Sequence, residues 1–247
     1  MIATIAIAVL VTWLLLVEPV LGRVAHRRLL AALDNGDTDA RQHFYLSWTW
    51  QGWALVLVTL LLTLGLCGWT PAQLGLRLPQ LTAQVPFGFV AGVCMALLAG
   101  ALTGVVMARK SSGTRSARVP PRVAGGDKVL RMLPHTRRER WAFAALAITA
   151  GIGEELVWRG FGLGALQLWL PHASTGLLIV LLAVGFGWAH LYQGLVGMLA
   201  TGLIGALMAG LYLATGCLLL PMLLHTLLDL RALLIPTAVS ATAGPTA

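Results

Sequence analysis

The chain has 247 residues, of which 58% are hydrophobic and only 11% are charged, and its mean hydropathy is +0.83. These values exclude a soluble globular domain and indicate an all-α, polytopic transmembrane helix bundle. The formal charge of +8 does not indicate a nucleic-acid partner, because most basic residues lie in two loops between apolar segments and so follow membrane topology.

Seven apolar segments are long enough to cross a bilayer, and an eighth embedded or re-entrant piece could lie among the short C-terminal ones. We interpret Glu18, beside Pro19 near the end of the first span, as a helix-end carboxylate at the membrane interface. The segment 74–79 is predicted not to cross the membrane. The predicted spans cover residues 1–21, 44–67, 83–107, 141–166, 174–192, 194–215 and 218–235. Small residues at every fourth position predict tight packing of the sixth span: Gly197, Thr201, Gly205 and Ala209.

Two predicted loops, 22–43 and 108–140, contain four and ten Lys or Arg residues. Because cytoplasmic loops carry the excess of positive charge, we place both in the cytoplasm and the N-terminus outside. The longer loop can also lie on anionic membrane lipids. The tail 236–247 is small, uncharged and predicted to be unstructured. The composition, with two lysines among many arginines, fits a GC-rich bacterium and hence a bacterial plasma membrane.

Charged residues are concentrated in one apolar segment, 151–160, which contains Glu154, Glu155 and Arg159. Each charge costs about 3 kcal/mol at the centre of a membrane helix, so the segment indicates a functional site. On a helix Glu155 and Arg159 are four residues apart and can pair. Glu154 points about 100° away from that face and stays free. Two adjacent carboxylates in a poor solvent are a typical source of a general acid or base.

Two further helices carry polar residues at helical spacing. Phe186 and His190 are four residues apart in the fifth span, as are His225 and Asp229 in the seventh. Three helices can therefore present polar groups to one bundle interior, where they could form a catalytic site, a metal site or a proton relay. A purely structural network of hydrogen bonds and ion pairs is the alternative.

The residues are adequate for hydrolysis, since a carboxylate and an imidazole can activate water and protonate a leaving amine. A serine nucleophile is not indicated, because the chain has no Gly-x-Ser-x-Gly. The cysteines at 67, 94 and 217 lie far apart in apolar segments and are interpreted as buried hydrophobic residues. The His-Glu-x-x-His zinc motif is also missing, although His190, His225 and a carboxylate could hold Zn²⁺.

Taken in order, Glu154-Glu155-x-x-x-Arg159, Phe186-x-x-x-His190 and His225-x-x-x-Asp229 resemble the CPBP intramembrane protease family. That family comprises the CAAX prenyl endopeptidases and bacterial proteins linked to bacteriocin maturation and self-immunity. The resemblance covers about residues 134–231, and it divides the chain into N-terminal spans (1–133), catalytic helices (134–235) and a flexible tail (236–247).

The resemblance implies a glutamate-dependent intramembrane endopeptidase that needs no metal cofactor. Glu154 would activate water with His190, while Glu155 and Arg159, together with Phe186, would support them. His225 and Asp229 would occupy the oxyanion-stabilising positions. The prenyl endopeptidases carry Asn where this chain has Asp229, and an ionised Asp cannot donate a hydrogen bond, so Asp229 is either protonated or orients His225.

We expect the substrate to be a peptide precursor or membrane protein, rather than a prenylated tail. The alternative is a non-catalytic immunity or scaffold protein that binds a peptide or partner in its polar cavity. A proton-coupled transporter is less favoured, because the motif-bearing spans show no inverted repeat. Counted from Trp141, Glu154 lies about 20 Å into its span. This depth leaves open three arrangements: the helix begins outside the membrane, the topology is inverted, or the site opens elsewhere.

Overall fold

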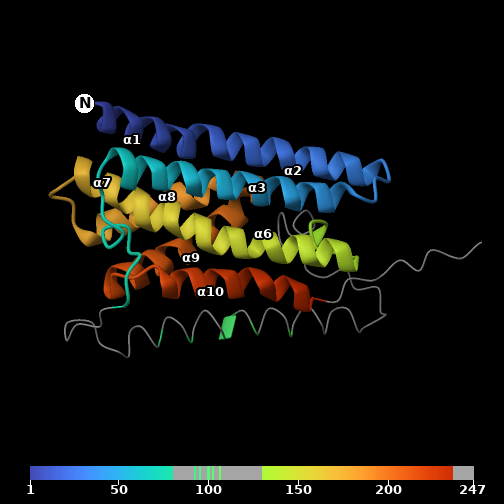
Figure 1. Ribbon diagram of the computed structural model, residues 1–247. Coiled ribbons are helices and arrows are strands. Elements are labelled where there is room, and N and C mark those ends of the chain that lie inside the picture. The colour runs from blue at the N-terminus through green and yellow to red at the C-terminus, as the bar shows by residue number, and fades with distance from the viewer. Residues whose placement is uncertain are drawn as a thin grey trace, which may run out of the picture.

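The computed structural model describes residues 1–79 and 130–235, with residues 92, 95, 99, 100, 102 and 106 between them. Every regular element in this part of the chain is helical, and the long helices lie side by side along one direction (Figure 1). The all-α fold is confirmed. Four helical runs among the described residues are long and apolar enough to span a membrane, which makes this an integral membrane protein: Ile2–Asp34, Ala40–Leu66, Arg137–Trp169 and Leu191–Thr215.

The other predicted spans have a different status. The third, 83–107, and the tail, 236–247, fall almost entirely outside the described residues. The fifth corresponds to α8 (Thr175–Ala189), which has 15 residues, and the seventh to α10 (Leu219–Leu230), which has 12. A short 3₁₀ segment, η5 (Arg231–Leu234), follows α10.

The N-terminal helix corrects the prediction of a loop over 22–43. It runs without a break through α1 (Ile2–Thr12), the π-helical η1 (Trp13–Val17) and α2 (Glu18–Asp34). The helix ends only at Asn35 and Gly36, where a φ of +81° suits glycine. The span prediction failed here because it located the end of the apolar stretch, whereas the helix continues beyond it until the chain meets a helix breaker.

The second long helix consists of α3 (Ala40–Leu60) and the π-helical η2 (Leu61–Leu66). The described residues that follow it, 67–79, form turns and no helix, in agreement with the prediction that 74–79 is not a span. Their contacts connect them to the corner between α9 (Gly194–Thr215) and α10: the Leu218 amide donates to the Gly75 carbonyl at 2.9 Å, and Arg77 Nε donates to the Gly216 carbonyl at 2.7 Å.

The third long helix is longer than its predicted bounds of 141–166. It comprises α6 (Arg137–Glu155), the π-helical η3 (Leu156–Gly162) and α7 (Leu163–Trp169). Thr136 begins it with a capping box, because its side chain accepts from the Glu139 amide while the Glu139 carboxylate accepts from the Thr136 amide. The helix therefore starts within the basic segment that was predicted to be a loop.

Helix α6 lies between α3 and α10 and packs on both (Figure 1). Gly151 allows the contact with α10, since a Cβ there would lie 2.1 Å from Thr226 Oγ1. Helices α8 and α9 also approach closely, because a Cβ on Gly187 would lie 2.6 Å from the Met198 carbonyl. The predicted tight packing of α9 is seen at Gly205, where a Cβ would lie 2.8 Å from the Phe186 ring.

Candidate active site

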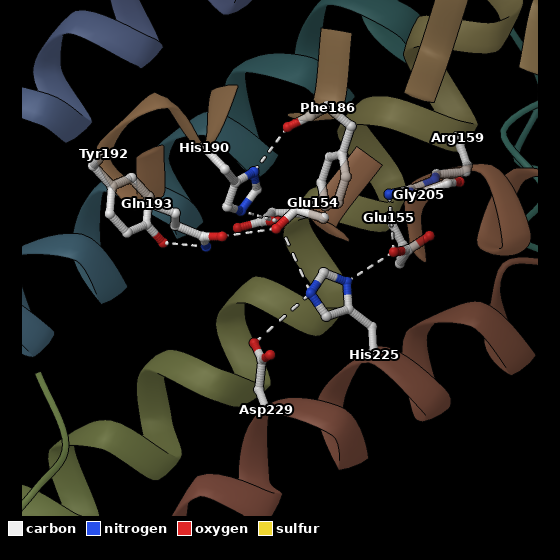
Figure 2. Close-up of polar contacts among 11 residues, drawn as sticks. Glu154, Glu155, Arg159, Phe186, His190, Tyr192, Gln193, Gly205, His225 and Asp229 are labelled. Atoms are coloured by element: carbon white, nitrogen blue, oxygen red, sulfur yellow. Dashed lines mark hydrogen bonds and ion pairs between the residues drawn. The ribbon is translucent and has the colours of Figure 1, made fainter. Parts of the chain in front are cut away.

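The helices bring all seven predicted site residues into one cluster (Figure 2). Glu154 and Glu155 end α6, and the π-helical η3 begins with the next residue and contains Arg159. Helix α8 supplies Phe186 and its C-cap His190, and α10 supplies His225 and Asp229. A π segment is rare and is often found at functional sites, and here it directly follows the two carboxylates and carries the guanidinium that pairs with Glu155.

Glu155 and Arg159 form a fully buried ion pair, with exposed fractions of 0% and 1%. Arg159 Nη1 donates to Glu155 Oε1 at 3.0 Å, and Nη2 donates to the Gly205 carbonyl on α9 at 3.0 Å. The guanidinium carbon lies 4.3 Å from the centre of the Phe186 ring. The predicted pairing is therefore confirmed, and Arg159 also connects three helices.

His225 is oriented by the same buried carboxylate. Its Nδ1 lies 2.8 Å from Glu155 Oε1, so an ionised Glu155 accepts a hydrogen bond from Nδ1–H. Its Nε2 faces two other carboxylates, at 3.9 Å from Glu154 Oε2 and 3.7 Å from Asp229 Oδ2. The ring is thus surrounded by three acidic side chains, an arrangement that favours a positively charged imidazolium.

The tautomer of His190 follows from its backbone contact. Its Nδ1 lies 2.8 Å from the Phe186 carbonyl oxygen, which can only accept, so Nδ1 carries the proton. In the neutral ring Nε2 therefore has a free lone pair. This atom lies 3.8 Å from Glu154 Oε2. His190 is accordingly held as a base that points at Glu154.

Glu154 lies between the two imidazole rings, and its Oε2 faces the Nε2 atom of each (Figure 2). This oxygen is buried and has no direct hydrogen-bond partner among the described residues. Both distances exceed a direct hydrogen bond but suit a single bridging water. Glu154 is therefore the carboxylate of the pair that is free to act on a bound molecule, whereas Glu155 is engaged by Arg159 and His225.

A connected set of polar residues beside His190 was not predicted. Gln193 Oε1 accepts from Thr201 Oγ1 at 2.8 Å, and Gln193 Nε2 donates to Tyr192 Oη at 3.2 Å. Tyr192 and Gln193 belong to the short η4 (Leu191–Gln193) between α8 and α9. Their residue types are ordinary for a connection between helices, so only the fold reveals that they line the site.

A cavity of about 500 Å³ is lined by five of the seven cluster residues, all except Glu155 and Arg159. Glu154, His190, His225 and Asp229 line it at one level, and mostly apolar and aromatic side chains extend it toward the end of the bundle where α6 begins. Glu18, on the first helix, also lines it. The other lining residues include Trp48, Leu55, Tyr45, Phe143, Met132 and Ala232. Such a cavity has the size and character of a ligand site.

The polar side chains of the cluster do not have the arrangement of a metal site. Within the part of the chain that the structure describes, no group of three His, Cys, Asp or Glu side chains is arranged to hold a metal ion. His225 Nδ1 is already engaged by Glu155, and the Nε2 atoms of the two histidines face Glu154 from 3.8 and 3.9 Å. The ligand atoms of a tetrahedral zinc site lie closer to one another than this, so these side chains would have to move to bind one Zn²⁺.

Residues 136–231 match the model of the family described as type II CAAX prenyl endopeptidase Rce1-like. This segment begins at the cap of α6 and ends just after α10, so it contains every residue of the cluster. No curated protein and no solved structure matches the chain. The predicted family resemblance is thereby confirmed: the chain carries an Rce1-like CAAX prenyl endopeptidase domain, which belongs to a family of peptide hydrolases.

Proposed function

We propose that this Rce1-like chain is a membrane-embedded, glutamate-dependent endopeptidase that cleaves a membrane-associated protein or peptide precursor. One observation carries the proposal: Glu154 lines the cavity with its Oε2 facing two imidazole Nε2 atoms, while Oε1 of Glu155 is engaged by Arg159 and His225. A free carboxylate beside a neutral imidazole is what hydrolysis by activated water requires.

In the proposed reaction a water lies between Glu154 and His190 and attacks the carbonyl carbon of the scissile peptide bond. Glu154 takes the proton of the attacking water, aided by the lone pair on His190 Nε2. When the carbon–nitrogen bond breaks, this proton passes to the leaving amine. The supporting geometry is the His190 tautomer, which is set by the Phe186 carbonyl.

His225 is proposed to stabilise the oxyanion. Because Nδ1–H already donates to Glu155, only the imidazolium form has an Nε2–H to give to the developing negative charge. Asp229 would then act through its charge, by favouring the imidazolium from 3.7 Å, rather than by donating a hydrogen bond itself.

The depth of the site supports access from the basic face of the membrane. Glu154 lies about 22 Å along the helix from Trp169, the last residue of this helical run. If Trp169 marks one boundary of a hydrocarbon core of about 30 Å, Glu154 lies about 8 Å from the other boundary, on the basic side. Helix α6 starts further out, at Arg137. The cavity extends the same way, toward Met132 and Ala232. We infer a multi-pass protein of seven or eight spans in a bacterial plasma membrane, whose site opens to the cytoplasm.

The test compares wild type with Glu154→Gln in lipid nanodiscs, using a mixed library of prenylated and unmodified peptides with EDTA present. Glu154→Gln keeps the shape of the side chain and removes the base, so the cleavage rate should fall by about 100-fold or more. Asp37→Asn, which removes a charge from an exposed turn, should cleave like wild type.

The outcomes separate the rival functions. Cleavage by wild type alone, with EDTA present, would support a metal-independent glutamate peptidase and report its sequence preference. Cleavage that needs added Zn²⁺ would indicate a metal enzyme instead. Failure of both folded proteins to cleave any member of the library would favour a non-catalytic immunity or scaffold role in which the cavity binds a peptide.

A further inference from the structure

Glu18 lies in the middle of a membrane helix, and its role is not explained by the helix-end interpretation. The run Ile2–Asp34 is continuous, and Glu18 lies about 24 Å from its start. The N-terminus and helix α7, which ends at Trp169, lie at the same end of the bundle (Figure 1). Glu154 is about 22 Å along its helix from Trp169, so the two carboxylates lie at a similar depth. With a hydrocarbon core of about 30 Å this depth is about 6 Å inside the boundary, where a carboxylate is still less favourable than in water and is a candidate functional residue.

The carboxylate of Glu18 is held in place by two neutral donors. Trp13 Nε1 donates to Oε2 at 3.1 Å, and Gln51 Nε2, from α3, donates to Oε1 at 3.1 Å. In the described part of the chain no Lys, Arg or His nitrogen forms an ion pair with Glu18. Its orientation is therefore determined by neutral donors, and no cationic side chain among the described residues is paired with it.

Glu18 lines the cavity that contains Glu154. Among the described lining residues, three carboxylates (Glu18, Glu154 and Asp229) stand against Arg231 and the His225 imidazolium, and both cations lie with Glu154 or Asp229 rather than with Glu18. The lining also includes Leu14, one helical turn from Glu18, and Trp48 and Leu55, one turn to either side of the Gln51 that contacts Glu18. A Lys or Arg side chain suits such a wall, because its aliphatic stem packs on apolar surface while its charged end reaches a carboxylate.

We propose that Glu18 is a specificity-determining residue that binds the cationic side chain of a Lys or Arg near the scissile bond of the substrate. The inference rests on the proposed peptidase function and adds the chemistry of its substrate. It also gives the N-terminal helix, which lies outside the matched domain of 136–231, a part in substrate selection.

The test measures binding, so that it does not depend on cleavage. Pairs of peptides that differ only in a Lys or an uncharged norleucine at one position are titrated against Glu154→Gln in nanodiscs. The Lys peptide should bind about tenfold more tightly at one position of the series, as expected for one charge-assisted hydrogen bond. Adding Glu18→Gln should abolish this preference, while the affinity for the norleucine peptide stays the same. Adding Asp37→Asn instead should leave the preference intact.

Equal affinity for both peptides at every position, or a preference that survives Glu18→Gln, would overturn the inference. If Glu18→Gln binds neither peptide, Glu18→Asp decides, because it retains the charge: a recovered Lys preference supports the inference, and equal binding of both peptides overturns it. Failure of the peptidase proposal is seen separately, as the lack of cleavage by wild type.

Discussion

Arg159 is the buried residue on which the supporting part of the site depends, since it donates to Glu155 and to the Gly205 carbonyl. Arg159→Met should leave the buried Glu155 carboxylate with His225 as its one remaining partner and lower the free energy of unfolding by about 3 kcal/mol. Thermal unfolding of the purified protein in nanodiscs measures this loss. Arg159→Lys should lose less, because it keeps the charge but not the two-pronged geometry.

The double variant Glu155→Gln/Arg159→Met separates pairing from burial. Because it removes both charges, its loss of stability should be clearly smaller than the sum of the two single losses. The same unfolding measurement on the two single variants and the double completes the cycle. Strictly additive losses would show that the two side chains do not stabilise one another, contrary to their 3.0 Å contact.

Asp229 provides a test of the proposed role of His225. If it acts through its charge, Asp229→Asn should lower kcat about tenfold, equivalent to about 1.4 kcal/mol of transition-state stabilisation, with little change in KM. The physical reason is the loss of one of the three carboxylates around the imidazole. Steady-state cleavage of a peptide identified by the library measures it. An unchanged or higher kcat would instead favour a hydrogen-bond donor at this position.

At the scale of the elements, the site depends on how closely α6 and α10 approach. Gly151→Ala should force these helices apart, because the added Cβ would lie 2.1 Å from Thr226 Oγ1 and 2.7 Å from its backbone nitrogen. Overpacking of this kind lowers the free energy of unfolding by about 1–3 kcal/mol. It should also separate His225 from Glu155 and strongly reduce the cleavage rate. Unfolding temperature and cleavage rate are measured together.

Gly210→Ala is the matched control for this substitution. Gly210 lies within α9, and a Cβ there would meet nothing within 4 Å. Replacing glycine by alanine inside a helix should then stabilise the protein by about 0.5–1 kcal/mol and leave cleavage unchanged. A loss of activity in Gly210→Ala as large as that in Gly151→Ala would show that the effect is not specific to the α6–α10 contact.

The sequence allowed side-chain contacts within one helix to be predicted, but not the contacts between helices. Glu155 and Arg159 could be paired in advance because helical spacing alone places them on one face. The hydrogen bond from His225 to Glu155 joins residues 70 positions apart and depends on the close approach at Gly151. Spacing placed His225 on a polar face of its own helix but could not identify its partner.

The same limit explains the misassignment around Glu18. Hydropathy locates the end of the apolar stretch, but a helix can continue past the membrane boundary, as Ile2–Asp34 does. A helix of 33 residues is about 50 Å long, well beyond a hydrocarbon core of about 30 Å. The position of Glu18 beside the cavity follows from the neighbouring helix and its Gln51, which the local sequence does not indicate.

In the molecule as a whole, basic residues gather at one end of the bundle. The turn between α2 and α3 and the segment before α6 meet there, since Arg131 contacts Asp34 at 2.5 Å and Arg41 Nε donates to the Arg131 carbonyl at 2.9 Å. The end of η5 lies in the same region, because Arg140 Nη2 donates to the Leu233 carbonyl at 2.7 Å. The opposite end holds the connection between α7 and α8, which includes the exposed His172.

This charge asymmetry predicts the orientation of the protein in the membrane. In a background with Cys67, Cys94 and Cys217 replaced by alanine, a membrane-impermeant maleimide added to intact spheroplasts should label His172→Cys but not Asp37→Cys. Both positions should be labelled once the membrane is opened, which serves as the control for accessibility. Labelling of Asp37→Cys alone in intact spheroplasts would invert the topology, and the cavity end near Met132 and Ala232 would then face the outside.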